Sequence, residues 1–193
     1  VMLAGAGAEA FALEQGFDPV PPTHFATERR RQALEAYRAN EQAGLGPEND
    51  HKFGTVGVVV LDQAGTLVAG TSTGGITGKR WGRIGDSPVI GAGTYANNRS
   101  CAVSATGHGE YFIRLTVARD ICARIQFGGA TLEEAANIFV MEELVTAAGE
   151  GGVVAVDRAG SVALVFNTSG MYWASIDATG EKIVGIYDED ESP

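Results

Sequence analysis

The segment that most constrains the fold is the nearly unbroken apolar run Val56–Leu61, which directly follows Gly54 and Thr55. A strand that is apolar on both faces is expected to be covered on both faces, so this strand should lie inside a layered structure. The turn-prone stretch Asp62–Gly65 and a second strand, Leu67–Thr73, come next. Two strands joined by a short turn containing glycine predict an antiparallel hairpin.

After two N-terminal helices, the pattern predicts strands, then two long helices, then strands. Helices are expected over residues 2–16, 27–39, 107–127 and 131–147, the last of them starting with a capping box, Thr131-Leu-Glu-Glu134. Further strands are expected at Val89–Thr94, Cys101–Thr106, Val153–Val156, Val162–Phe166, Met171–Ile176 and Ile183–Tyr187. Residues 40–54 show no periodicity and predict an exposed linker. Because strands and helices do not alternate, we expect an α+β fold with helices packed on antiparallel sheets.

Composition narrows the possible partners and the compartment. The 193 residues are 45% hydrophobic and 20% charged, which is enough apolar material for a core. A net charge of −10 argues against nucleic acid or an anionic membrane as a partner. No apolar run approaches the roughly 18–20 residues that span a bilayer, and no signal-peptide pattern is visible. We therefore expect a cytoplasmic protein, and the absence of an initial Met suggests that the chain is a fragment.

Cysteines and histidines give little indication of redox or metal chemistry. Cys101 and Cys122 both lie in apolar segments, which favours buried free thiols over a disulfide or a catalytic cysteine. The histidines, His24, His51 and His108, lack the spacing of metal ligands, so no metal site is expected.

The position of Thr55 is unusual for a hydroxyl residue, since it follows a glycine at the first position of a buried strand. Cleavage of the Gly54–Thr55 bond would give Thr55 both a free α-amine and a hydroxyl, which are a base and a nucleophile on one residue. The residues alone leave this open, because threonines are also ordinary strand formers. Arg83 and Asp86, nearby in a glycine-rich loop, could equally form a simple salt bridge.

Several short motifs together resemble the plant-type (type 2) L-asparaginase/isoaspartyl peptidase family of N-terminal-nucleophile hydrolases. In chain order they are Gly54-Thr-Val-Gly57, Thr71-Ser-Thr-Gly-Gly75, Gly82-Arg-Ile-Gly-Asp-Ser-Pro88, Gly91-Ala-Gly-Thr-Tyr-Ala-Asn97, Thr106-Gly-His-Gly-Glu110 and Phe166-Asn-Thr-Ser-Gly-Met171. Each motif is weak alone, but their order and spacing agree with the family. The resemblance extends from Val1 to about Tyr187.

The resemblance implies a precursor that cuts itself between Gly54 and Thr55. Thr55 would then be the catalytic nucleophile, and Thr73 would supply a supporting catalytic hydroxyl. Thr106 would also be catalytic, lining the side of the site where negative charge develops on the substrate oxygen.

The same resemblance implies how a substrate would be held. Arg83 would bind its α-carboxylate, because a guanidinium matches a planar anion in two places. Asp86 would bind its α-ammonium. Gly107 and Gly109, together with Thr106, would line the binding site. The expected substrates are small molecules, L-asparagine and β-aspartyl dipeptides.

The resemblance further implies a four-layer αββα sandwich of antiparallel sheets flanked by helices, forming one structural domain. Residues 1–54 would be the C-terminal part of an α subunit plus a linker, and residues 55–193 the β subunit. Family members have a long segment before the counterpart of Val1, with a first strand and a sodium-binding loop. We therefore expect a fragment or a truncated protein that lacks this N-terminal part, no cofactor in this chain, and a homodimer of αβ units.

Two other functions remain open from the sequence. One is a related self-processing enzyme, either a glycosylasparaginase or a threonine endopeptidase like taspase, although paired cysteines typical of extracellular proteins are not evident. The other is a non-catalytic remnant that binds a partner. A substrate assay would distinguish the first hypothesis from both.

Overall fold

The computed structural model describes residues 2–45 and 54–187 and divides into two compact units. The first unit comprises residues 1–52 and 75–84, and the second comprises residues 53–74 and 85–193. Each unit is considered by itself below. In the described part of the chain, no helix combines the length and the hydrophobicity needed to cross a membrane.

The first unit contains α1 (Gly5–Glu14), a 3-10 turn (Pro22–Phe25) and α2 (Glu28–Gln42). Thr27 caps α2, its hydroxyl accepting a hydrogen bond from the backbone N–H of Arg30, as the sequence predicted. The helix continues to Gln42, three residues further than expected, so the predicted linker at residues 40–54 was wrong at its start. The rest of that linker, residues 46–53, lies outside the described residues.

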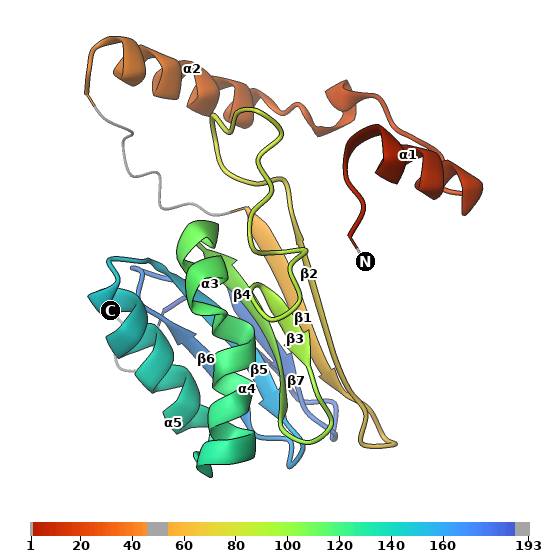
Figure 1. Ribbon diagram of the computed structural model, residues 1–193, viewed down its shortest axis with the longest axis vertical. Coiled ribbons are helices and arrows are strands. Elements are labelled where there is room, and N and C mark those ends of the chain that lie inside the picture. The colour runs from red at the N-terminus through yellow and green to blue at the C-terminus, as the bar shows by residue number, and fades with distance from the viewer. Residues whose placement is uncertain (1, 46–53, 188–193) are drawn as a thin grey trace. The chain divides into compact units, whose positions relative to one another are not determined.

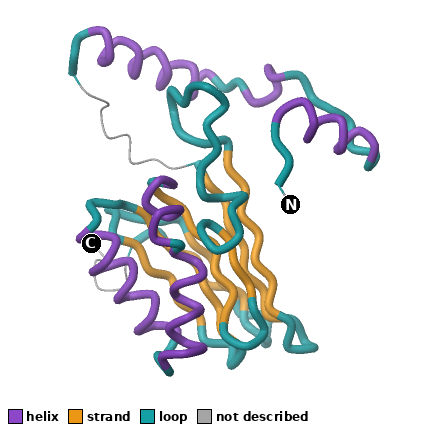
Figure 2. The backbone as a smooth tube through the Cα atoms, in the orientation of Figure 1, coloured by secondary structure: helices purple, strands orange, loops and turns teal. Residues whose placement is uncertain are grey.

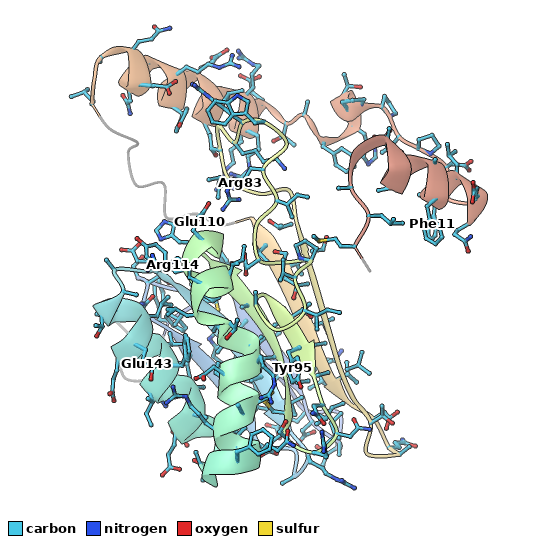
Figure 3. All side chains as sticks on the ribbon, viewed as in Figure 1. Phe11, Arg83, Tyr95, Glu110, Arg114 and Glu143 are labelled. Atoms are coloured by element: carbon cyan, nitrogen blue, oxygen red, sulfur yellow. A yellow bond between two sulfur atoms is a disulfide. The ribbon has the colours of Figure 1, made fainter. Side chains whose placement is uncertain are left out.

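A loop of the first unit, residues 75–84, contacts α2. Arg80 forms an ion pair with Glu41, with 2.5 Å between Nη2 and Oε2. Gly78 packs so closely on the ring of Tyr37 that a Cβ at this position would lie 2.5 Å from Cε1. Arg83, labelled in Figure 3, lies in this loop.

The second unit is built on an antiparallel sheet in the order β3-β4-β5-β6. Its strands are β3 (Thr94–Ala96), β4 (Cys101–Gly107), β5 (Gly151–Asp157) and β6 (Val162–Phe166). Two hairpins accompany it: β1 (Thr55–Leu61) with β2 (Leu67–Thr73), and β7 (Trp173–Ile176) with β8 (Lys182–Gly185). The helices are α3 (Gly109–Leu115), α4 (Val117–Gly128), α5 (Leu132–Asn137), a π-helical segment (Ile138–Glu143) and α6 (Leu144–Thr146). This confirms the predicted α+β class.

The helices and the β1–β2 hairpin pack on opposite faces of the sheet, with α4 and α5 side by side on one face (Figure 1). Alternate side chains of β4 point to opposite faces of the sheet, one set toward the helices and the other toward the hairpin. Cys101, Val103 and Ala105 join the core under the helices, whereas Ala102 packs with Leu67 of the hairpin. The tube drawing in Figure 2 shows the same layering, helices against strands.

The outer face of the β1–β2 hairpin differs from the sequence prediction. Val56, Val58 and Val60 are 68%, 56% and 44% exposed, and Val68 on β2 is 51% exposed. The prediction that both faces of this strand are covered was therefore wrong for the residues that the structure describes. The apolar run reflects an apolar inner face and an equally apolar, uncovered outer one.

Three hairpins use the same turn chemistry. In each, an aspartate accepts two backbone N–H bonds from residues two and four positions later, and a glycine three positions later adopts positive φ. The pairs are Asp62 with Gly65 (φ 80°), Asp157 with Gly160 (φ 88°) and Asp177 with Gly180 (φ 87°). These N–H donors lower the pKa of the Asp62 carboxyl, with Thr66 as the main one, and a bond from the Thr179 hydroxyl does most to lower that of Asp177.

Several boundaries differ from the prediction. Residues 89–93 form a bend, an isolated β-bridge at Ile90 and turns rather than a strand, and β3 starts only at Thr94. The expected helix over residues 107–127 is two helices, because Thr116 adopts a left-handed conformation with φ 50°. The capping box at Thr131 and Glu134 is confirmed, with both reciprocal bonds present.

The cysteine prediction was wrong. Cys101 at the start of β4 and Cys122 in α4 form a disulfide, and both are fully buried. The sequence placed both residues in apolar segments, and that part holds. Only the packing of α4 on β4 brings the two Cα atoms to 5.4 Å, a separation that suits a disulfide.

Candidate active site

The site begins with a pair of threonines at one end of the β1–β2 hairpin. Thr55 is the first residue of β1 and pairs in register with Thr73, the last residue of β2. The Thr55 hydroxyl donates to the Thr73 hydroxyl, with 3.2 Å between the oxygens. Thr73 is exposed and Thr55 half-buried, so the pair lies where a small substrate could reach it.

The strand order places Thr106 at the same end as this pair. Leu61 and Leu67, at the turn end of the hairpin, pack with Ala102 near the start of β4. Further along, Thr71 of β2 contacts Ser104 of β4. The hairpin and β4 are therefore aligned.

Thr106 follows Ser104 by two residues and shares its face of β4, the face that meets the hairpin. Continuing from Ala102 past Ser104 along the strand leads toward the open end where Thr55 and Thr73 lie. The sequence predicted all three threonines as site residues, and the fold brings them to the same end of the two packed sheets.

Gly107 and Gly109 allow close backbone packing beside Thr106. Gly107 pairs with Gly151 of β5, and a Cβ on Gly107 would lie 2.4 Å from the carbonyl oxygen of Glu150. A Cβ on Gly109 would lie 2.7 Å from Oδ1 of Asp86. Glycine is therefore required at both positions, since any side chain would collide with these neighbours.

Asp86 is held in a buried position, with 6% of its surface exposed. Its backbone carbonyl accepts hydrogen bonds from the N–H groups of Val89 and Gly93, at 2.8 and 3.1 Å. Gly93 also packs against the side chain, because a Cβ there would lie 2.6 Å from Oδ2. The predicted ammonium-binding carboxylate is thus fixed between two glycines, Gly93 and Gly109.

Two predicted residues lie outside this group. Arg83 belongs to the first unit, so its predicted role rests on the sequence motif. Gly54 is exposed and immediately precedes β1, and its predicted role as the cleavage site likewise rests on the sequence motif. Across residues 2–45 and 54–187, the His, Cys, Asp and Glu side chains nowhere gather in threes that could hold a metal ion.

Sequence reasoning missed the residues that support the site. Asn167, part of a quoted motif, accepts a hydrogen bond from the N–H of Gly151 and donates to the carbonyl of Gly149, at 2.8 and 3.0 Å. It thereby fixes the loop that backs Gly107. Ser104 was detectable in the sequence as the one polar residue in the buried run Cys101–Ala105.

An α+β fold with a threonine pair at a strand end is what the resemblance to N-terminal-nucleophile hydrolases predicted. The chain belongs to the asparaginase family, which matches residues 1–186. It is 48% identical over 194 residues to the isoaspartyl peptidase of Escherichia coli strain K12, covering 98% of this chain and 60% of that protein. It is also 48% identical over 194 residues to the isoaspartyl peptidase of Salmonella typhimurium strain LT2, covering 98% of this chain and 62% of that protein.

A mammalian relative carries a double name. The isoaspartyl peptidase/L-asparaginase of Bos taurus is 39% identical over 173 residues, covering 90% of this chain and 56% of that protein. The chain thus spans 56–62% of the length of these three relatives.

Proposed function

We propose that the protein cleaves itself between Gly54 and Thr55 and then hydrolyses L-asparagine, β-aspartyl dipeptides or both. The observation that carries this proposal is the hydrogen bond between the Thr55 and Thr73 hydroxyls at the start of β1. The names of the relatives, isoaspartyl peptidase and isoaspartyl peptidase/L-asparaginase, favour this substrate class over a glycosylasparaginase or a taspase-like endopeptidase.

In the first stage, Oγ of Thr55 attacks the carbonyl carbon of Gly54. The bond from that carbon to the Thr55 nitrogen breaks, the nitrogen takes up a proton, and an ester to Oγ remains. Water then hydrolyses the ester, giving a carboxylate on Gly54 and a free amine on Thr55. The exposed backbone at Gly54 gives water access to this bond.

In the second stage, the Thr55 amine acts as the general base. Its unperturbed pKa of about 7.7–8.0 leaves a usable neutral fraction near pH 7. It takes the proton of the Thr55 hydroxyl as Oγ attacks the substrate amide carbonyl. Ammonia or an amino acid leaves with that proton, and water hydrolyses the β-aspartyl ester to aspartate. Thr73, whose hydroxyl already contacts Oγ, supports this charge movement.

The remaining site residues select the substrate. The buried Asp86 carboxylate holds the α-ammonium group. The sequence motif alone assigns the α-carboxylate to the Arg83 guanidinium, which matches a planar anion. Thr106 and the backbone of Gly107 face the oxyanion that forms on the attacked carbonyl. Both substrate types present the same aspartyl α-groups, so both would be bound.

The decisive experiment is mass spectrometry of the purified full chain, combined with assays of ammonia release from asparagine and of β-aspartyl dipeptide hydrolysis. We expect two fragments, one ending at Gly54 and one starting at Thr55. Thr55→Ala should remain intact and inactive. Ser72→Ala is a matched control, because Ser72 is exposed on the opposite face of β2. An active sample that contains only intact chain, or cleavage of Thr55→Ala, would refute the proposal.

A further inference from the structure

A pair of hydroxyls lies between the two sheets, where the neighbouring contacts are apolar. Ser104 of β4 is 2% exposed, and its Oγ lies 2.6 Å from Oγ1 of Thr71 on β2. Toward the turn end the same interface contains an apolar cluster that includes Ala102, Leu67 and Val59. A buried hydroxyl in such surroundings costs about 1–3 kcal/mol if it has no partner, so the two oxygens hold each other in place.

The hydrogen bonds of this pair have a direction. Thr71 Oγ1 also lies 2.9 Å from the carbonyl oxygen of Gly93, which can only accept. The single proton of the Thr71 hydroxyl therefore goes to Gly93. Ser104 must then be the donor to Thr71, which gives a chain from Ser104 through Thr71 to Gly93.

This chain joins the three segments that carry the site. Thr71 precedes Thr73 by two residues on the same face of β2, and Ser104 precedes Thr106 in the same way on β4. Gly93 donates its N–H to the carbonyl of Asp86, 3.1 Å away. One hydroxyl thus connects the strands of the nucleophile pair, the oxyanion wall and the ammonium-binding loop.

Gly57 of β1 gives this junction its room. It pairs with Thr71 across the hairpin, and a Cβ at this position would lie 2.1 Å from Oγ of Ser104. The backbone of β1 therefore rests directly on the Ser104 hydroxyl, two residues from Thr55. A change in the distance between β1 and β4 at this contact would therefore also move Thr55.

We propose that the Thr71 hydroxyl, held by Ser104, is a positioning group that fixes the Thr55–Thr73 pair relative to Thr106 and Asp86. It does not touch the reacting atoms. The inference rests on the proposed function, because a position matters to chemistry only if these residues react. A displacement of about 1 Å in a reacting group can lower a rate by about 100-fold, so a single junction of this kind can control turnover.

The test compares Thr71→Val, which keeps the shape and loses the hydroxyl, with Thr71→Ser, which keeps the hydroxyl. Three quantities are measured on the full chain: the rate of Gly54–Thr55 cleavage, kcat and KM for a β-aspartyl dipeptide, and the free energy of unfolding in urea. Ser72→Ala, next to Thr71 but on the exposed face, is the control.

We expect Thr71→Val to slow cleavage and lower kcat by about 10- to 100-fold, with KM changed less than threefold. Thr71→Ser should stay within about threefold of the wild type. Ser104→Ala should have a smaller effect than Thr71→Val, because the bond from Thr71 to Gly93 persists. If Thr71→Val does not fold, Ser104→Ala carries the test: it should lower kcat more than Thr71→Ser does, and an equal or smaller loss would overturn the proposal.

The proposal is overturned if Thr71→Val cleaves and turns over like the wild type. It is also overturned if Thr71→Ser loses as much activity as Thr71→Val, since size rather than the hydroxyl would then matter. Loss of stability with unchanged kcat in the folded fraction would show a purely structural role. A wild-type chain that neither cleaves nor turns over substrate would instead refute the proposed function, and the inference with it.

Discussion

The contact between Gly57 and Ser104 makes Gly57→Ala a sharp test of how the hairpin is held. The new Cβ would lie 2.1 Å from Oγ and 2.9 Å from Cβ of Ser104. Rotation of the Ser104 side chain removes the first collision but not the second, so β1 has to move away from β4. Reaching a normal separation of about 3.5–4.0 Å requires a displacement of roughly 0.6–1.1 Å.

The expected cost follows from two opposing effects. Overpacking of this kind costs about 1–3 kcal/mol, while replacing a glycine inside a strand gains about 0.5–1 kcal/mol from the unfolded state. We therefore expect Gly57→Ala to lower the free energy of unfolding by about 1–2 kcal/mol. Because Thr55 moves with the strand, self-cleavage should slow by about 10- to 100-fold.

Urea unfolding followed by circular dichroism measures the first effect, and gel analysis of cleavage measures the second. Gly70→Ala is the matched control, since its Cβ would meet only Cγ1 of Val58 at an ordinary 3.6 Å. Adding Ser104→Gly to Gly57→Ala removes both colliding atoms and should recover part of the lost stability. The reasoning is refuted if Gly57→Ala is as stable as Gly70→Ala, or if Ser104→Gly recovers nothing.

Three further predictions concern stability. Replacing Cys101 and Cys122 by Ala should cost about 3 kcal/mol in urea unfolding, and a thiol assay in denaturant without reductant should find no free thiols; two reactive thiols would contradict the disulfide. Folding lowers the pKa of Asp62 and Asp177, so the stability they add is present above about pH 4 and is lost as the pH falls through their folded pKa values. Replacing both by Asn should make the free energy of unfolding fall less steeply with decreasing pH below about pH 4, and an unchanged slope would contradict this. Thr131→Ala removes the cap of α5 and should lower the unfolding free energy by about 1 kcal/mol, whereas Thr131→Ser should not; equal values for the two variants would contradict the capping role.

The local features of the fold could be predicted from the sequence because their causes lie within a few residues. The β1–β2 hairpin follows from two apolar runs and a turn, and the cap of α5 follows from Thr131 and Glu134. The register that pairs Thr55 with Thr73 is set by the same short turn. These features depend on hydrogen bonds within the hairpin and within one turn of the helix.

Other features could not be predicted because their causes are distant in sequence. Residues 89–93 were predicted as part of a strand, but they turn and place Gly93 within hydrogen-bonding distance of Asp86 and Thr71. The disulfide requires α4 to pack on β4. The helical periodicity continues on both sides of the break at Thr116, where the N–H groups of Ala118 and Arg119 instead bond to the carbonyls of Ala92 and Gly91.

The sequence by itself determined which residues carry the predicted chemistry: Gly54 and Thr55 at the mouth of a strand, with Thr73 opposite in the hairpin. Tertiary structure alone decided that Thr106 and the buried Asp86 lie in one unit with the β1–β2 hairpin. It also decided that Thr106 lies at the end of β4 nearest the Thr55–Thr73 pair. The physical reason is the packing of one sheet on another. Apolar contacts around Ala102 align the strands, and the hydrogen bond from Ser104 to Thr71 fixes them at one register.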